Sequence, residues 1–367
     1  MNDNLTRYFA IQKALKQLRT TEPKGNVARH LNTLAMFISG IVGSQKCNLP
    51  AIARKVPLHG KPQSRVRRME RWLSNKAIDT TLYYLPYLQA LLQNLSEGHL
   101  VLVMDGSEAG RDCVLLSINV VYKKRALPLA WLIVKGKKGH LSQQTHIELV
   151  KKLAPILPKE RDIVFLGDGE FDGTQLLTTL QELGWNYVCR TAKNVVLTEE
   201  GEKFKPTDLI LQQGDRIELS DVGFTAAEYG PVLVCIVWEA RWTEPLILVS
   251  NLDFLEEAYG YYQQRFRIET FFSDQKSRGF YLSHSHISDT SHLERLLIAT
   301  CLSYIWMVCL GSWVVATGRL SLIHRSDRCD WSLFRIGLAW LEYCLNEDIP
   351  IWTQFAVPEH GGVKCVG

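Results

Sequence analysis

Residues 100–135 read LVLVMDGSEAGRDCVLLSINVVYKKRALPLAWLIVK and contain three apolar runs rich in β-branched residues. The first run, LVLVMD, ends on Asp105. The second and third runs are separated by Lys123, Lys124 and Arg125, and a short polar break between two such runs is typical of a β-hairpin. We therefore expect three antiparallel strands in this stretch.

The sequence that follows alternates between helical and strand patterns. A polar loop at 135–144 leads into an amphipathic pattern at 143–154, which predicts a helix. The run IVFLGDGEF, residues 163–171, predicts a buried strand that ends on acidic residues. A helical pattern at 174–184 and an apolar run at 186–191 complete the series. Three antiparallel strands, a helix, a parallel strand, a helix and a further strand is the order of a ribonuclease H-like sheet, so we expect an α/β core of that class.

Changes in residue pattern divide the chain into five predicted segments. A basic helical part precedes the α/β core, a strand-rich stretch interrupts the core, and helices close it. The predicted boundaries are 1–98 for the basic helical domain, 99–194 for the first part of the core, 195–250 for the β insertion, 251–350 for the second part of the core with its C-terminal helices, and 351–367 for the tail.

The net charge of +4 is distributed unevenly along the chain. Residues 1–98 carry 15 Lys and Arg against 5 Asp and Glu, whereas residues 99–367 carry 27 against 33. A basic segment joined to a mildly acidic body indicates binding to a polyanion. Solubility alone does not explain why the excess is confined to about a quarter of the chain.

One predicted helix within the basic segment separates apolar and cationic side chains. In SRVRRMERWLSN, residues 64–75, Val66, Met69 and Leu73 share one helical face. Three arginines lie on the opposite face: Arg67, Arg68 and Arg71. A helix packed on one side and cationic on the other suits phosphate contacts in a helical DNA-binding domain. The alternative is an ordinary solvated basic face.

Composition excludes several other classes of protein. The nine cysteines are scattered without a CxxC pair, which favours a reduced, cytoplasmic setting over a disulfide framework or a zinc site. Residues 296–318 carry no charge and are long enough to cross a bilayer. Thr300, Ser303 and Ser312 interrupt this run, so we expect a buried helix and no membrane insertion.

Two aspartates end predicted strands that are neighbours in a ribonuclease H-like sheet. Asp105 ends the first strand and Asp168 ends the fourth, and adjacent strands lie about 4.8 Å apart. Carboxylates so close repel each other unless a cation lies between them, and Mg²⁺ is a suitable oxygen-seeking cation. Four further acids compete for these roles: Glu108, Asp112, Glu170 and Asp172.

The stretch YYQQRFRIETFFSDQK, residues 261–276, supplies a third carboxylate. In one continuous helix, Tyr262, Arg265, Glu269 and Lys276 fall within roughly 60° of one another. Glu269 would complete a site for two divalent ions that promote in-line displacement at phosphorus. Arg265, Lys276 and Tyr262 are suited to contacts with phosphate oxygens. An ordinary surface helix with ion pairs is the alternative.

These motifs together resemble a known family. The spacing Y-x2-R-x3-E-x6-K, the DGS that begins at Asp105 and the DGEFDG that begins at Asp168 are similar to the signatures of DDE-type bacterial insertion-sequence transposases, in the family named after insertion sequence four. The similarity spans nearly the whole chain, and SLFRIGLAWLEYCL at 332–345 resembles the closing helix of that family.

The resemblance implies a function and roles for individual residues. It implies that Asp105, Asp168 and Glu269 bind two Mg²⁺ ions, for which Mn²⁺ can substitute, and that Tyr262, Arg265 and Lys276 hold phosphates. Such transposases bind terminal inverted repeats of double-stranded DNA as homodimers in a paired-end complex. They cleave donor DNA with water and join the 3′-hydroxyl ends to target DNA.

Further residues are candidates for DNA contacts under this resemblance. Trp238 and Trp242 could stack on a base extruded from the duplex, with packing in the core as the alternative. Five cations are candidates for lining the DNA path, with a generic surface role as the alternative: Lys135, Lys137, Lys138, Arg190 and Lys193. Two other functions remain open: a ribonuclease H-like nuclease that cuts without joining strands, and a captured copy retained as a DNA-binding regulator.

Overall fold

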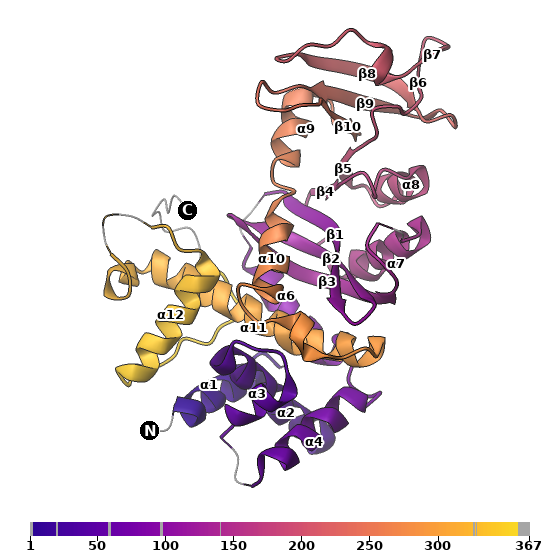
Figure 1. Cartoon of the computed structure of the whole chain (residues 1–367). Coiled ribbons are helices and arrows are strands. Elements are labelled where there is room, and N and C mark those ends of the chain that lie inside the picture. Colours follow the sequence, from indigo (N-terminus) through magenta and orange to yellow (C-terminus); the bar gives the residue numbers. More distant parts are fainter. Residues whose placement is uncertain are drawn as a thin grey trace.

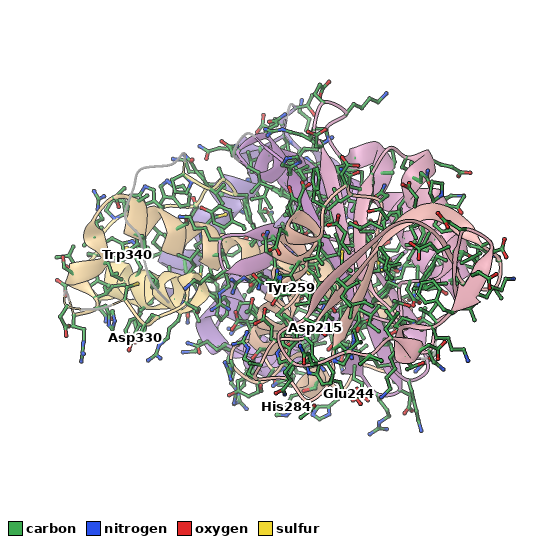
Figure 2. All side chains as sticks on the ribbon, turned by 90° about the horizontal axis from the view of Figure 1, so that it is seen from above. Asp215, Glu244, Tyr259, His284, Asp330 and Trp340 are labelled. Atoms are coloured by element: carbon green, nitrogen blue, oxygen red, sulfur yellow. The ribbon has the colours of Figure 1, made fainter. Side chains whose placement is uncertain are left out.

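The structure is a computed structural model, and it describes residues 3–19, 21–57, 60–95, 98–139, 141–325, 327 and 329–358. The part of the predicted tail at 359–367 lies outside these residues. The N-terminal helices lie at one end of the protein and the large sheet at the other, and the C-terminal helices α11 and α12 lie between them (Figure 1). In the view from above, Trp340 and Asp330 of the C-terminal part lie at the end of the molecule opposite to the insertion strands (Figure 2).

One sheet of ten strands forms the centre of the protein, in the order β3-β2-β1-β4-β5-β10-β9-β8-β6-β7. Its first half contains the five core strands, which are β1 (Leu100–Gly110), β2 (Cys113–Tyr122), β3 (Arg125–Lys135), β4 (Ile163–Gly167) and β5 (Asn186–Arg190). Strands β1, β2 and β3 are antiparallel, and β4 lies parallel to β1 and to β5. The α/β class with a large sheet and the predicted neighbours β1 and β4 are therefore confirmed.

The predicted hairpin is also present. Tyr122 and Arg125 pair across a two-residue turn at Lys123 and Lys124, and Lys123 adopts a left-handed backbone conformation with φ of 53°. Positive φ at such a position matches the twist of the flanking strands.

The strands of residues 195–250 continue the core sheet. They are β6 (Leu197–Glu199), β7 (Glu202–Phe204), β8 (Arg216–Phe224), β9 (Tyr229–Val237) and β10 (Leu246–Ser250). Strand β10 pairs antiparallel with β5, for example Val249 with Cys189, and this pairing joins the two halves of the sheet. The insertion is thereby attached to the strand that follows β4 in the sheet.

Helices cover both faces of the sheet (Figure 1). One face carries α7 (Gln143–Leu153) and α8 (Thr174–Glu182), and the other carries α9 (Leu255–Tyr262) and α10 (Arg267–Lys276). The apolar helix α11 (Thr290–Ala316) packs against β3 and is followed by α12 (Leu333–Asn346). By length and composition α11 alone among the described helices could span a membrane, but its most apolar window is 94% buried inside the protein. This burial is what the sequence predicts for residues 296–318.

Among the residues that the structure describes, six helices precede the sheet: α1 (Asp3–Gln17), α2 (Gly25–Ser44), α3 (Leu49–Arg54), α4 (Pro62–Ser74), α5 (Thr80–Tyr83) and α6 (Leu85–Gln93). Helix α4 buries Val66, Met69 and Leu73, as its sequence pattern predicts, and also Trp72. The guanidinium of Arg295 in α11 donates hydrogen bonds to the carbonyls of Leu73 (2.7 Å) and Ile78 (3.1 Å). The basic helix α4 is therefore tied directly to the core.

The prediction of one continuous helix over residues 261–276 is wrong. Helix α9 ends at Tyr262, residues 263–266 form turns, and α10 begins at Arg267. Helix α9 packs on β4, β5, β9 and β10, whereas α10 packs on β1, β2 and β3. Because a β-sheet twists from strand to strand, one straight helix cannot follow both sets of strands, and the break allows each helix to lie on its own part of the sheet.

Candidate active site

Asp105 and Asp168 lie at the same level of two adjacent parallel strands. The last registered pair between β1 and β4 is Val103 with Leu166, and each aspartate follows two residues later. The expectation that Asp105 ends its strand is wrong, because β1 continues to Gly110 through its pairing with β2. Strand β4 does end at Gly167, just before Asp168. The sheet therefore presents both side chains at the point where β4 stops.

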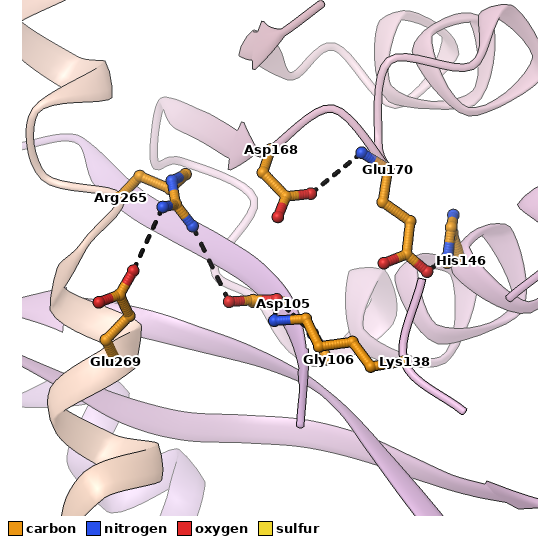
Figure 3. Close-up of polar contacts among 8 residues, drawn as sticks. All are labelled: Asp105, Gly106, Lys138, His146, Asp168, Glu170, Arg265 and Glu269. Atoms are coloured by element: carbon orange, nitrogen blue, oxygen red, sulfur yellow. Dashed lines mark hydrogen bonds and ion pairs between the residues drawn. The ribbon is translucent and has the colours of Figure 1, made fainter. Parts of the chain in front are cut away.

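Asp105 is a buried carboxylate surrounded by donors (Figure 3). Its side chain is only 4% exposed, and Oδ1 lies 2.8 Å from Nζ of Lys138. The same oxygen accepts a hydrogen bond from the backbone N–H of Gly106 at 2.7 Å. Burial raises the pKa of Asp105, Lys138 opposes this effect, and the charge of Asp168 adds to it. The two aspartates thus lie close enough to interact electrostatically.

Arg265 lies between Asp105 and Glu269 (Figure 3). Its Nη1 is 3.8 Å from Oδ2 of Asp105, and its Nη2 is 3.3 Å from Oε1 of Glu269. The turn between α9 and α10 places this buried guanidinium against the sheet, with the ring of Phe266 4.3 Å from its central carbon. Glu269 is in the first turn of α10 and its side chain is 57% exposed. One guanidinium therefore links the acid of β1 to the acid of the facing helix.

The acids that compete with Asp168 are engaged elsewhere. Glu170 lies 3.6 Å from Nε2 of the buried His146, which lowers the pKa of Glu170. Asp172 accepts a hydrogen bond from the hydroxyl of Thr191 at 2.7 Å. Asp168 accepts a backbone hydrogen bond from Glu170 at 3.0 Å, which fixes its carboxylate at the start of the loop.

Lys276, the last residue of α10, interacts electrostatically with Asp105 and Glu108. Burial lowers the pKa of Lys276, the charges of Glu108 and Asp105 oppose this effect, and the charge of Lys138 adds to it. Lys276 and Lys138 are thus close enough to repel each other beside Asp105.

A groove of about 800 Å³ opens next to Asp168. Its lining includes five residues that the sequence singles out, which are Asp168, Arg190, Trp242, Tyr262 and Arg265. Tyr259 and Glu244, labelled in Figure 2, also line it. Aromatic rings and guanidinium groups along a groove beside carboxylates suit a polyanionic ligand with bases that stack.

Lys135 is the last residue of β3 and Lys137 lies in the loop after it, and the remaining predicted side chains fall into two groups. Lys193 and Trp238 lie beside the groove, since Lys193 pairs with Glu244 at 2.8 Å and the indole N–H of Trp238 donates to the carbonyl of Trp242 at 3.0 Å. The three arginines of α4 are on the N-terminal helices, where Arg67 and Arg71 are exposed. Arg68 instead donates from Nε to the hydroxyl of Thr33 in α2 at 3.1 Å.

The types of residue fit Mg²⁺, but their present spacing does not. Two aspartates and a glutamate are the oxygen donors that this ion prefers. Within the part of the chain that the structure describes, no three His, Cys, Asp or Glu side chains lie close enough together to hold a metal. Arg265 and Lys138 instead occupy the surroundings of Asp105.

Sequence reasoning missed two contacts of this site. Lys138 was a candidate only for the DNA path, yet it forms the shortest ion pair of Asp105. His146, the partner of Glu170, has no distinguishing signal, because one histidine on the apolar face of a helix looks like any core residue. Both contacts join segments far apart in the sequence, which local spacing does not reveal.

Comparisons with known proteins bear on this site. A family model described as the transposase DDE domain matches residues 98–306, more than half of the chain. The comparison with curated proteins found no match to this chain. The structure is similar to that of a piggyBac transposase synaptic complex with hairpin DNA, at 12% identity and a TM-score of 0.48, over 98% of this chain and 84% of that chain. It is also similar to endonuclease V from Bacillus subtilis, at 14% identity and a TM-score of 0.25, over 62% of this chain and 89% of that chain. Both TM-scores are below 0.5, so the assignment rests on the family model, and the chain belongs to the transposase DDE domain family.

Proposed function

We propose that this protein is the Mg²⁺-dependent transposase of an insertion sequence, with Asp105, Asp168 and Glu269 as its catalytic acids. One observation carries the proposal. Within the segment that matches the family, Asp105 and Asp168 stand at the same level of adjacent strands, and Arg265 connects Asp105 to Glu269. Three acids from distant segments therefore face one region of the protein.

The finer classification follows from the strand order and the helix motif. The order β3-β2-β1-β4-β5 supports a ribonuclease H-like catalytic core. The spacing of Tyr262, Arg265, Glu269 and Lys276 supports the family named after insertion sequence four. We propose the domain boundaries given above unchanged, with residues 1–98 as the DNA-binding domain.

The three acids share one role in the proposed reaction. The carboxylates of Asp105, Asp168 and Glu269 would hold two Mg²⁺ ions, or Mn²⁺ in their place. When bound, such ions activate the attacking oxygen and stabilise the leaving oxygen at phosphorus. The chain itself would position the scissile phosphate, while Glu170 and Asp172 make their own contacts with His146 and Thr191.

The DNA substrate would lie along the groove beside Asp168. Arg190 and Tyr262 line this groove, and Trp242 adds an aromatic surface on which a base could stack. Trp242 lies in a T-shaped arrangement with Tyr259, with 6.5 Å between their ring centres, and the indole of Trp238 is tied to the carbonyl of Trp242. Trp242 is thus the stronger candidate for stacking.

The proposed assembly is a homodimer on two transposon ends. Each protomer offers one set of three acids, whereas an insertion sequence has two ends to process. The exposed Arg67 and Arg71 of α4 would contact phosphates of the terminal inverted repeats, in a cytoplasmic protein that meets DNA at the nucleoid.

A strand-transfer assay tests this function directly. The purified protein is incubated with a duplex that carries a pre-cut transposon end, a supercoiled target plasmid, and Mg²⁺ or Mn²⁺. We expect products in which the 3′ end of the duplex is joined to the plasmid. Nicked plasmid without joined product would support the nuclease alternative. Binding without either product would support a captured DNA-binding regulator.

A further inference from the structure

The carboxylate of Asp105 contacts a cationic side chain through each of its oxygens. Oδ1 lies 2.8 Å from the ammonium of Lys138, and Oδ2 lies 3.8 Å from the guanidinium of Arg265. Arg265 also contacts Glu269 at 3.3 Å. Two protein cations therefore occupy the space beside the acids where divalent ions would bind under the proposed function.

Charge repulsion at this site disfavours the presence of both sets of cations beside the acids. Three carboxylates with Lys138 and Arg265 carry a net charge of about −1, and two divalent ions added without any movement would bring it to about +3. Lys276, close enough to interact with Lys138 and Asp105, would add to the repulsion. Since like charges at short range in a partly buried site repel strongly, entry of the metal ions favours departure of the side-chain cations from the carboxylates.

Lys138 is placed so that it can leave. Its side chain is 45% exposed. It lies in a loop between Gly136 and Gly139, whose positive φ angles of 140° and 83° suit the conformational freedom of glycine. Rotation of the long lysine side chain would remove its ammonium from Asp105 without any change in the sheet.

We propose that Lys138 and Arg265 act as displaceable counterions, which hold the acids in a metal-free form and transfer to DNA phosphates when the metal ions bind. This inference rests on the proposed function. Its consequence is that binding of DNA strengthens binding of the metal ions, and binding of the metal ions strengthens binding of DNA. Each DNA phosphate attracts a side-chain cation away from the carboxylates, which leaves them available to the metal ions. A protein without DNA then binds Mg²⁺ weakly, which limits cleavage away from the correct substrate.

Mn²⁺ binding to the full-length protein without DNA tests the first half of the inference. Mn²⁺ affinity is measured by electron paramagnetic resonance and by calorimetry. We expect Lys138→Gln to bind Mn²⁺ about tenfold more tightly than the wild type, because a competing charge-assisted contact is removed. Lys138→Met provides a second uncharged side chain of similar length. Lys151→Gln, an exposed lysine in the last turn of α7 with the same change in charge, is the matched control and should stay within about twofold of the wild type.

Adding DNA tests the coupling. In the wild type, a duplex that carries the transposon end should tighten Mn²⁺ binding. In Lys138→Gln the same duplex should tighten it less, because one counterion is already absent. Circular dichroism and thermal unfolding establish that the variants are folded.

The outcomes separate this inference from the proposed function. If Asp105→Asn abolishes Mn²⁺ binding while neither Lys138 variant tightens it beyond the Lys151→Gln control, the counterion role is overturned and the metal site stands. If Asp105→Asn leaves Mn²⁺ binding unchanged, the metal site itself is misassigned and the proposed function loses its basis. Equal gains in affinity on adding DNA to the wild type and to Lys138→Gln would also overturn the coupling.

Discussion

Asp274 in α10 forms a buried ion pair with Arg125, the first residue of β3, at a distance of 2.9 Å. Burial raises the pKa of Asp274 from 3.8 to about 6, and the charges of Arg125 and Arg278 oppose this effect. The contact fastens the helix that carries Glu269 and Lys276 to the sheet. It therefore connects the stability of the protein to the position of side chains in the proposed site.

This carboxyl group makes a measurable contribution to pH-dependent stability. Between about pH 4 and about pH 6, Asp274 stays protonated in the folded protein but is ionised in the unfolded chain. Its contribution to the free energy of unfolding is therefore full below about pH 4 and is lost as the pH rises through about 6. We expect the free energy of unfolding of Asp274→Asn to fall less than that of the wild type between these pH values. Urea unfolding at a series of pH values measures the difference.

Asp289 provides a control of opposite sign. Its side chain accepts a hydrogen bond from the backbone N–H of His292 at 2.8 Å, which lowers its pKa. Its contribution to stability is present above the unfolded pKa and is lost as the pH falls. Asp289→Asn should therefore alter the pH profile in the opposite sense to Asp274→Asn. Identical profiles for both variants and the wild type would contradict the assignment of these shifts.

Removing one of the proposed catalytic carboxylates should abolish chemistry and preserve DNA binding. We expect Asp105→Asn, Asp168→Asn and Glu269→Gln each to lower the cleavage rate at least about a hundredfold, since loss of groups that merely surround a metal already costs 10–100-fold. Cleavage of an end-carrying plasmid and gel-shift binding of the same end measure the two effects.

Asp112→Asn is the matched control for these substitutions. Asp112 is an exposed acid in the turn after β1, and asparagine tolerates its φ of 55°. Cleavage should remain close to that of the wild type. A variant of Asp105 or Glu269 that cuts normally but no longer binds DNA would contradict the proposed roles.

At the scale of elements, α11 and α12 cross at two glycines. A methyl group on Gly311 would collide with the backbone of Leu333, and one on Gly337 would collide with the backbone of Met307. We expect Gly337→Ala to destabilise the protein by about 1–3 kcal/mol, because the two helix backbones must separate. Gly260→Ala in α9 is the control: a methyl group there meets open space, so stability should rise by up to about 1 kcal/mol. Equal effects in chemical denaturation would contradict this packing.

Helix α4 should contribute phosphate contacts that depend on salt. Arg67 and Arg71 are exposed, so Arg67→Gln and Arg71→Gln should each reduce the slope of log affinity against log salt by about 1 and weaken binding to all DNA sequences alike. Fluorescence anisotropy across a salt series measures this slope. Lys203→Gln, on the distant strand β7, should leave the slope unchanged. An unaltered slope in both arginine variants would remove α4 from the DNA interface.

Elements with strong periodicity were predictable from the sequence, whereas their ends and breaks depended on distant contacts. The hairpin at Lys123 and the helices α7 and α8 follow from local patterns. The end of β1 did not, because DGSEAG resembles a turn but pairs with β2 as far as Gly110. No glycine or proline at residues 263–266 indicates the break after Tyr262, because contacts with the underlying sheet determine where α9 ends.

At the scale of the whole molecule, the three acids come from three distant segments. Arg265 contacts Asp105 and Glu269, Lys138 contacts Asp105, and Asp168 stands at the level of Asp105 on the adjacent strand. The spacing of the motifs predicted Asp105, Asp168 and Glu269 as candidates. It could not predict that two cations of the same chain contact Asp105, because these contacts arise only when the loop after β3 and the turn before α10 meet at β1. The hydrogen bond from Arg295 in α11 to the carbonyl of Leu73 likewise holds the basic helix α4 in position relative to this site.

The location of Mn²⁺ in a complex of the full-length protein with a transposon-end duplex is the most direct test of the account. Anomalous scattering identifies the ions without reference to the protein. We expect two Mn²⁺ ions bound by oxygens of Asp105, Asp168 and Glu269, with the guanidinium of Arg265 moved to a phosphate. Ions bound elsewhere, with these three carboxylates still separated and Arg265 still against Asp105, would contradict it.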